Sequence, residues 1–386
     1  MTRSALFALI AVLPGAAAAD RFTTAVAVEG WNDEVSPVHG VLLAAWDTKP
    51  LWRGGRLGVE LNTDTLRFSV DGVRINPDVE VGAAITSEFR VAGLLPDYYQ
   101  NGVTTPGRGF WASYLGFKAY GKARIAPRTW LDLEIGGRRF LFNPIEDGDR
   151  ATNPALTLPP NAWVFEPRLR YTWWNLADDA AWRDRHRFFP RLRGVAAGLE
   201  LGVDARSNDQ PWGALDADAF AVTDPRNAPD PFAPRVRQWL QAGWQIVPAV
   251  RTQLTETAVF GEGGDDLTRD RIGGAGPYSV TLPGAPWASW LSERYLAGSW
   301  SWHFAVSPDV EVGPVVGAVL LSDPDRVGAD DEVATLLGVG ALADWRIGPW
   351  QVDVRGGWSP SVSERADQLA FSVWLGGGYV FEMDEP

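Results

Sequence analysis

Large apolar residues occupy every second position over long stretches of this chain, and small or polar residues stand between them. Between residues 195 and 204, one face carries Val195, Ala197, Leu199, Leu201 and Val203. The opposite face carries Gly198, Glu200, Gly202 and Asp204. Successive side chains of a β-strand point to opposite sides, so this period of two predicts strands rather than helices. Similar alternation covers residues 56–62, 79–86, 131–136, 296–306 and 350–355.

The length of these runs indicates a membrane barrel. They last about ten residues, which suits a tilted strand crossing a bilayer, whereas strands of globular proteins average about five or six. A soluble β-sandwich also alternates, but it rarely sustains about fifteen such strands in one domain. We therefore predict an all-β fold, a transmembrane antiparallel up-and-down β-barrel with apolar residues facing lipid and polar residues facing the lumen. About fourteen to seventeen candidate strands, and the even strand numbers of bacterial barrels, favour about 16 strands, with 14 as the next choice.

The composition agrees with a barrel and excludes several other classes of protein. Apolar residues make up 46% of the chain, 20 residues are Trp, the formal net charge is -13 and there are 0 Cys. An acidic chain lacks the basic surface that displaces counterions from nucleic acid, and without Cys there is no disulfide, thiolate nucleophile or zinc–thiolate site. Several Trp residues lie near the ends of predicted strands, where an interfacial aromatic girdle is expected: Trp46, Trp130, Trp163, Trp173, Trp174, Trp345 and Trp358.

The first residues have the layout of a secretory signal peptide. A short basic start at Arg3 precedes an apolar stretch, and residues 17–19 are three alanines that form a cleavage site before Asp20. An amphipathic or buried N-terminal helix is the alternative. Residues 1–19 are therefore expected to be removed on export, leaving residues 20–386 as one barrel domain in the outer membrane of a Gram-negative bacterium. Past this segment, no run of about 18 apolar residues predicts a membrane-spanning helix.

The predicted connections between strands are of two kinds. Tight turns are expected at residues 62–64, 70–73 and 347–349, because Asn, Asp, Gly and Pro supply turn geometry there. Long polar loops are expected at residues 96–109, 143–161, 177–193 and 208–234. In outer-membrane barrels, short turns lie on the periplasmic side and long loops on the extracellular side, so the two kinds should gather at opposite ends.

A glycine- and proline-rich stretch, residues 271–287, carries a resemblance to a known family. Gly273 and Gly274 open it, and residues 292–295, Ser-Glu-Arg-Tyr, begin the strand that follows it. These positions resemble the surface-antigen barrels of the Omp85 superfamily, in which a Gly-Gly precedes a long loop folded into the lumen. The resemblance implies that residues 271–287 fold inward, with Arg271, Tyr278, Glu293 and Arg294 at the lumen or the loop. The loop tip lacks the family's Arg-Gly-aromatic motif, and strands begin too close to Asp20 for periplasmic POTRA domains, which argues against a chaperone-docked insertase.

Little in the sequence indicates catalysis. Ser301 and His303 lie two residues apart and thus on one face of a strand, as in outer-membrane lipid hydrolases. The alternative is that both merely line the lumen, and no third orienting residue is evident in the sequence. Acidic loops within residues 146–149, 178–179, 263–266 and 323–332 match no calcium-loop pattern and suit solvated loops that bridge to lipopolysaccharide through divalent ions. We therefore assign no catalytic, cofactor-binding or metal-binding residue, and we do not expect an enzyme.

The resulting functional hypothesis is a pore or translocation barrel with a polar lumen, plugged by residues 271–287. A structural or adhesive barrel with a filled lumen is the first alternative, and a lipid hydrolase using Ser301 and His303 is the second. Lumenal Arg residues within 138–139, 168–170 and 235–237 are expected to meet lumenal carboxylates, which include Glu60, Glu134, Glu200 and Asp204. The last strand ends in Tyr379-x-Phe381, which resembles the terminal signal recognised by the barrel assembly machinery, and residues 382–386 should overhang in the periplasm. Oligomeric state and transported substrate stay open.

Overall fold

The computed structural model describes residues 21–31, 39–47, 55–62, 65–88, 99–100, 103–104, 110–146, 151–152, 154, 156–176, 192–213, 228–265, 267–274, 280–285, 290–322, 333–348, 350–366 and 369–380. The predicted signal peptide at residues 1–19 lies outside the described residues. Tyr278, Phe381 and the predicted tail at residues 382–386 lie outside them as well.

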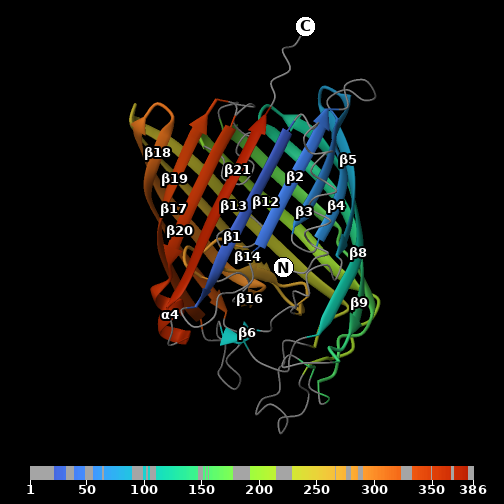
Figure 1. The fold of residues 1–386 in the computed structure, drawn as a ribbon. Helices are drawn as coiled ribbons and strands as arrows, with labels where there is room; N and C mark the ends of the chain where they lie inside the picture. The colour runs from blue at the N-terminus through green and yellow to red at the C-terminus, as the bar shows by residue number, and fades with distance from the viewer. Residues whose placement is uncertain are drawn as a thin grey trace.

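One antiparallel sheet forms a closed barrel, shown in Figure 1. Its strands are β1 (Arg21–Trp31), β2 (His39–Asp47), β3 (Arg56–Asn62), β4 (Thr65–Asn76), β5 (Val79–Glu88), β8 (Trp111–Ala126), β9 (Thr129–Asn143), β10 (Ala162–Phe165), β11 (Arg168–Leu176), β12 (Gly194–Arg206), β13 (Phe232–Val247), β14 (Val250–Gly261), β17 (Arg294–Ser307), β18 (Val310–Ser322), β19 (Val333–Ile347), β20 (Trp350–Trp358) and β21 (Ala370–Val380). Strand β1 closes the sheet by pairing with β21, from Arg21 opposite Val380 to Trp31 opposite Ala370.

The barrel has 16 strands within the described residues, as predicted. Both β10 and β11 pair with β9 on one side and β12 on the other, so together they make one strand of the wall. The interruption falls at Glu166 and Pro167, where proline has no N–H to give to the ladder. The predicted fold class, a transmembrane antiparallel β-barrel, is therefore confirmed.

Side chains follow the predicted inside–outside alternation. On β12, Leu199 and Leu201 are 42% and 47% exposed on the outer surface, whereas Glu200 and Asp204 are 6% and 4% exposed inside the barrel. The outer surface of β9 carries Leu133 in the same way. An exposed apolar belt on a closed sheet suits lipid, because closure satisfies the backbone inside the hydrocarbon.

The two ends of the barrel differ, and two predictions about them need correction. The end that carries the short connections at residues 77–78, 127–128, 248–249, 308–309 and 348–349 is here called the turn end, and the opposite end is the loop end (Figure 1). Residues 62–64 do connect two strands directly, but at the loop end. Residues 177–193, predicted as an ordinary long loop, connect β11 to β12 at the turn end.

The predicted tight turn at residues 70–73 is wrong. These residues form a β-bulge inside β4, because Val70 pairs with Ala83 and Val73 pairs with Val81 of the same neighbouring strand. Gly72 has a positive φ of 69°, and its N–H donates to the Tyr120 hydroxyl at 3.0 Å. The Asp-Gly pair therefore supplies a bend within one strand and does not reverse the chain.

The predicted aromatic girdle is partly correct. Trp163, Trp173, Trp345 and Trp358 are between 36% and 51% exposed on the outer surface. Trp130 points inward instead, with the Lys122 Nζ 4.7 Å from its ring centroid. Trp174 also points inward and lines a lumenal cavity. In both cases the residue has the opposite parity to the lipid-facing row of its strand. Trp46 lies in β2, and its side chain is outside the described residues.

One helix, α4 (Pro360–Ala366), connects β20 to β21 at the loop end (Figure 1). Ser359 caps it: its carbonyl accepts from the Ser363 N–H at 2.9 Å, and Pro360 fits the first helical position. Short pairs of strands, β6 (Tyr99–Gln100) with β7 (Val103–Thr104) and β15 (Asp270–Ile272) with β16 (Trp290–Ser292), complete the described elements. Among the described residues, no helix combines the length and apolar character that a membrane crossing needs.

Candidate functional site

The lumen contains a cavity of about 860 Å³. Strands β11, β13, β14 and β17 supply much of its wall, through residues such as Arg170, Trp239, Thr255 and Ser299. Residues of the 270–292 stretch, here called the inner segment, border it on the loop-end side. Leu192, which precedes β12, borders it from the turn end. The cavity therefore lies between two chain segments that enter the barrel from its two ends.

Asp270 anchors the start of the inner segment to the barrel wall. It forms ion pairs with Arg235 and Arg237 of β13, the latter at 2.8 Å, and accepts from the Tyr295 hydroxyl at 2.5 Å. Burial raises the pKa of the Asp270 carboxyl, but Arg237 and Arg235 more than offset this, so the pKa lies below its ordinary value. The carboxylate is therefore ionised and held by three side chains from two strands.

The middle of the inner segment lies on a row of glycines three to five strands further round the wall from β13. Pro283 and Gly284 contact β18, β19 and β20 at Gly317, Gly338 and Gly357. A Cβ built on Gly338 would collide with the Pro283 carbonyl oxygen, so no larger residue fits there without displacing the segment. The Gly284 N–H donates to Ser372 Oγ of β21 at 2.9 Å. The segment thus contacts the wall from β13 round to β21.

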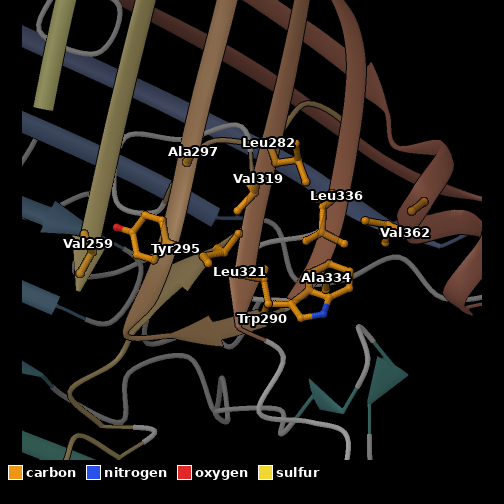
Figure 2. Packing of buried hydrophobic residues seen from close by; sticks show 13 residues of the cluster. Val259, Leu282, Trp290, Tyr295, Ala297, Val319, Leu321, Ala334, Leu336 and Val362 are labelled. Atoms are coloured by element: carbon orange, nitrogen blue, oxygen red, sulfur yellow. The ribbon is translucent and has the colours of Figure 1, made fainter. Parts of the chain in front are cut away.

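Apolar packing fixes the same segment, as Figure 2 shows. Ile272, Leu282 and Trp290 of the inner segment are at most 1% exposed. They pack against inward-facing residues of β14, β17, β18 and β19 and against Val362 of α4, namely Val259, Tyr295, Ala297, Val319, Leu321, Ala334 and Leu336. This cluster is unusual for a barrel interior, which is otherwise polar, and it marks the place where the segment docks.

Leu192 enters the lumen from the turn end. Its N–H donates to Gln253 Oε1 of β14, and a Cβ on Gly243 of β13 would collide with its carbonyl oxygen. Gly194 follows with a positive φ of 102°, where the chain turns into β12. Sequence analysis gave no signal for this inward backbone, because residues 177–193 are simply polar and irregular in pattern.

The predicted lumenal carboxylates are all paired with cations on neighbouring strands. Glu134 contacts Lys118 Nζ at 2.6 Å, Glu200 accepts from Arg170 Nη2 at 2.6 Å, and Glu60 lies 3.5 Å from Arg67. Asp204 pairs with Arg168. Arg138 donates to Glu166 at 3.0 Å, whereas Arg139 faces outward with its guanidinium 6.0 Å from the Trp163 ring centroid. The wall from β3 to β13 therefore carries alternating charges of both signs.

The structure brings together only some of the residues predicted around the inner segment. Gly273 and Gly274 lie in it with positive φ values of 106° and 93°, and their N–H groups bond Val280 O and Ala285 O. Arg271 lines the cavity. Glu293 and Arg294 lie at the loop end, where Glu293 accepts from the Gly264 N–H at 2.8 Å and Arg294 donates to Gly261 O at 3.0 Å.

The residues of the predicted assembly signal are only partly described. Tyr379 lies in β21, paired with Phe22 of β1 and Trp350 of β20, and its side chain is outside the described residues. Apolar residues beside it face outward, since Leu369, Val373 and Leu375 are 51%, 42% and 48% exposed.

Ser301 and His303 form a buried hydrogen-bonded group that the sequence suggested only in part. Ser301 Oγ lies 3.0 Å from His303 Nε2, and His303 Nδ1 lies 3.4 Å from Asp344 of β19. However, Arg251 Nη2 lies 2.8 Å from the same Nδ1, and a guanidinium only donates. Gln253 Nε2 likewise lies 2.9 Å from His303 Nε2 and only donates, so both ring nitrogens face donors and neither is free to take the Ser301 proton as a general base. His303 is also 1% exposed and inside the barrel, where it does not meet lipid.

The same group resembles a metal-binding cluster without needing a metal. Ligand atoms of His303, Glu311 and Asp344 lie within 4.8 Å of one another. Arg251 occupies the centre of this group, with Nη2 2.7 Å from Glu311 and 3.7 Å from Asp344. Its guanidinium supplies the positive charge that the two carboxylates require, so the arrangement is a buried ion network across β14, β17, β18 and β19. Asp344 and Glu311 are distant in sequence, and no spacing rule could have linked them to His303.

Comparison with known proteins supports the fold. No protein-family model matches the chain, and no curated protein matches its sequence. Among solved structures, BamA from Haemophilus ducreyi lacking POTRA domains 1-3 matches with a TM-score of 0.57 and 12% identity, covering 93% of this chain and 70% of that one. CdiB from Acinetobacter baumannii and CdiB from Escherichia coli match with TM-scores of 0.53 and 0.54 at 10% and 11% identity.

These matches cover 93% of this chain but only 59% and 63% of the two CdiB chains. At such low identity they show a shared barrel fold. At the level of the fold, this likeness agrees with the resemblance that residues 273–274 and 292–295 indicated.

Proposed function

We propose that this chain is an outer-membrane translocation barrel whose passage runs through the lumen and is closed by the inner segment. The observation that carries the proposal is the docking of that segment, through Asp270 on β13 and through Pro283 and Gly284 on β18 to β21. A segment docked inside the lumen along the wall from β13 round to β21 obstructs it. Its release would open a path that joins the 860 Å³ cavity to the loop end.

The barrel wall supports selection by charge and size. Lumenal Arg, Lys, Glu and Asp side chains alternate from β3 to β13, so a passing solute meets both signs in turn. Fixed lumenal charges set the preference of a pore without covalent chemistry. The fold shared with BamA and CdiB supports an outer-membrane location and a translocation role in general terms.

The location implies the partners. We propose export by the signal peptide at residues 1–19, recognition of Tyr379-x-Phe381 by the barrel assembly machinery, and contact of the polar loops with lipopolysaccharide. Arg139, outward beside Trp163 near the loop end of β9, is placed to meet lipid phosphate.

Planar-bilayer conductance tests the proposal. Purified wild-type protein should give small or rare openings, because the inner segment fills the path. Gly338→Val should displace Pro283 by filling its contact, and Asp270→Asn should weaken the pairing with Arg235 and Arg237. Both variants should give a several-fold larger conductance. Retained heat-modifiability on gels would show that each barrel has folded.

Gly356→Val is the matched control, because a Cβ at Gly356 meets only atoms at 4.0 Å and faces away from the segment. It should conduct like the wild type. Equal conductance in the wild type and both release variants would contradict closure by the inner segment. Folded protein that conducts in none of these forms would contradict translocation and favour a structural barrel with a filled lumen.

A further inference from the structure

One carboxylate breaks the inside–outside rule of the barrel. Glu256 of β14 lies between Thr255 and Thr257, which both line the lumenal cavity, so strand alternation directs its side chain outward even though the residue itself borders the cavity. Its neighbours in the ladder are Leu240 and Gly298. All the other carboxylates of the barrel strands whose burial the structure describes are lumenal or lie in the β4 bulge. Glu256 forms no hydrogen bond or ion pair with any described residue.

The position of Glu256 is within the lipid-facing belt. It stands six residues from the start of β14 and five from its end, and the outer surface of the same region carries Phe260, Leu296 and Trp300 at 66%, 41% and 46% exposure. A carboxylate facing hydrocarbon is unfavourable unless a partner donates to it. An intramembrane ionisable residue therefore indicates a contact made in the membrane.

A second polar residue lies beside it. Gln238 of β13 is exposed on the outer surface, between the outward-facing residues Val236 and Leu240, whereas Glu256 is half-buried. Its ladder partner is Ala258, two residues along from Glu256. At the turn end the strands lean toward the next strand in the order β20, β21, β1, β2 (Figure 1). For a tilt of about 40°, this lean puts Gln238 and Glu256 within about 2 Å of the same depth and about 8 Å apart along the wall.

We propose that this outer surface, here called the β13–β14 patch and defined by Gln238, Glu256, Ala258 and Gly298, is the interface of a two-fold dimer with a second copy of this chain. An axis along the membrane normal, midway between the two polar residues, places Glu256 of one copy opposite Gln238 of the other. The amide donates and the carboxylate accepts, twice per dimer. The patch is therefore complementary to itself, as an isologous interface requires.

Small residues allow the two walls to approach. Ala258 lies between the polar residues, and a Cβ added at Gly298 would meet only Thr255 O at 3.6 Å, so the outer surface is shallow there. Close approach of small residues is a common basis of association inside membranes, where lipid-facing surfaces gain nothing from the hydrophobic effect. The inference depends on the barrel lying in a membrane and not on passage through its lumen.

Cysteine cross-linking in native membranes tests the interface, and the absence of Cys from the chain makes the assay free of background. Gln238→Cys and Glu256→Cys chains, produced together and oxidised, should give a disulfide-linked dimer at least about fivefold more abundant than either chain alone, because like positions lie too far apart for a disulfide. Leu133→Cys, outward on β9, is the matched control and should give none.

A second pair of variants separates recognition from folding. Gln238→Leu with Glu256→Leu should leave a heat-modifiable barrel but convert dimer mass to monomer mass in mild detergent. Glu256→Gln should remain a dimer, because two amides still exchange hydrogen bonds. Monomer mass for the wild type together with no mixed disulfide would overturn the proposal. Cross-linking of Glu256→Cys to a different protein would overturn it too, by identifying another occupant.

Discussion

At the scale of single residues, the docking of the inner segment depends on the ionised carboxylate of Asp270. Two Arg side chains and one Tyr hydroxyl converge on it. Their combined attraction exceeds the effect of burial, so the pKa of Asp270 is depressed. A depressed pKa means that the stabilising contribution is present above the ordinary pKa of an aspartate and is lost as pH falls through the lower, folded-state value.

The conductance difference between wild type and Asp270→Asn should therefore depend on pH in one direction. Between pH 5 and 8 it should stay constant, because Asp270 remains ionised throughout. It should shrink only at more acidic pH, below the ordinary titration range of an aspartate, because the depressed pKa keeps the wild-type carboxyl ionised until then. Single-channel recordings at several pH values measure this, with Gly338→Val as a closure-defective control that keeps Asp270. A difference that grows on acidification would contradict the role given to this carboxylate.

The residues of the lumen could be predicted from the sequence only in strands where apolar and polar residues alternate clearly. Alternation assigned Glu200 and Asp204 to the lumen face because their neighbours on β12 are unmistakably apolar, and both side chains are buried. Residues 250–261 carry polar side chains at both parities, so the outward position of Glu256 gave no signal. The link between His303 and Asp344 depends on strand register across the barrel, which no local pattern specifies.

At the scale of elements, the bulge in β4 explains why one turn signal misled. Asp71 and Gly72 have turn chemistry, but strands on either side of them pair with β5. The extra residue changes the parity of the strand: Phe68 faces outward before it and Ile75 after it, with exposures of 53% and 65%. In a regular strand, Phe68 and Ile75 would face opposite sides. The extra residue at the Asp-Gly pair therefore allows both to face outward.

Deleting Gly72 should be tolerated. The deletion removes the extra residue between Val70 and Val73, gives regular pairing with β5 as far as Arg74, and keeps Phe68 and Val73 on the lipid face. Deleting Val81 from the regular strand opposite should instead turn the rest of β5 inside out and reduce folded protein strongly. Heat-modifiability and protease resistance in outer-membrane fractions compare the two. Failure of the Gly72 deletion with survival of the Val81 deletion would contradict this account of register.

At the scale of the whole molecule, the sixteen-stranded barrel could be predicted because length, alternation and strand parity all describe the same closed sheet. Closure depends on the pairing of β1 with β21, which runs through eleven positions from Arg21–Val380 to Trp31–Ala370. This junction of β1 with β21, here called the seam, is paired along its full length, so the strands have no unpaired stretch there at which they would separate easily. Passage through the lumen should therefore not require the seam to separate.

A disulfide across the seam tests this. Val28 and Val373 are register partners, and antiparallel partners lie about 4.5–5.5 Å apart at Cα, within disulfide range. Val28→Cys with Val373→Cys should conduct alike when oxidised and reduced, both alone and combined with Gly338→Val. A conductance that disappears on oxidation and returns on reduction would show that the route opens between β1 and β21, against passage through an intact barrel.

The pairing of Arg21 with Val380 at the turn end also has a consequence for the order in which the strands of this fold can be connected along a chain. A short linker would join these two positions, and a new opening at the connection between Ala126 and Thr129 would leave every pair of strands as it is. The barrel is in this sense a cycle in which no strand is first. Its geometry would permit circular permutation, and the order in which strands emerge during synthesis is a property of the gene and not of the fold.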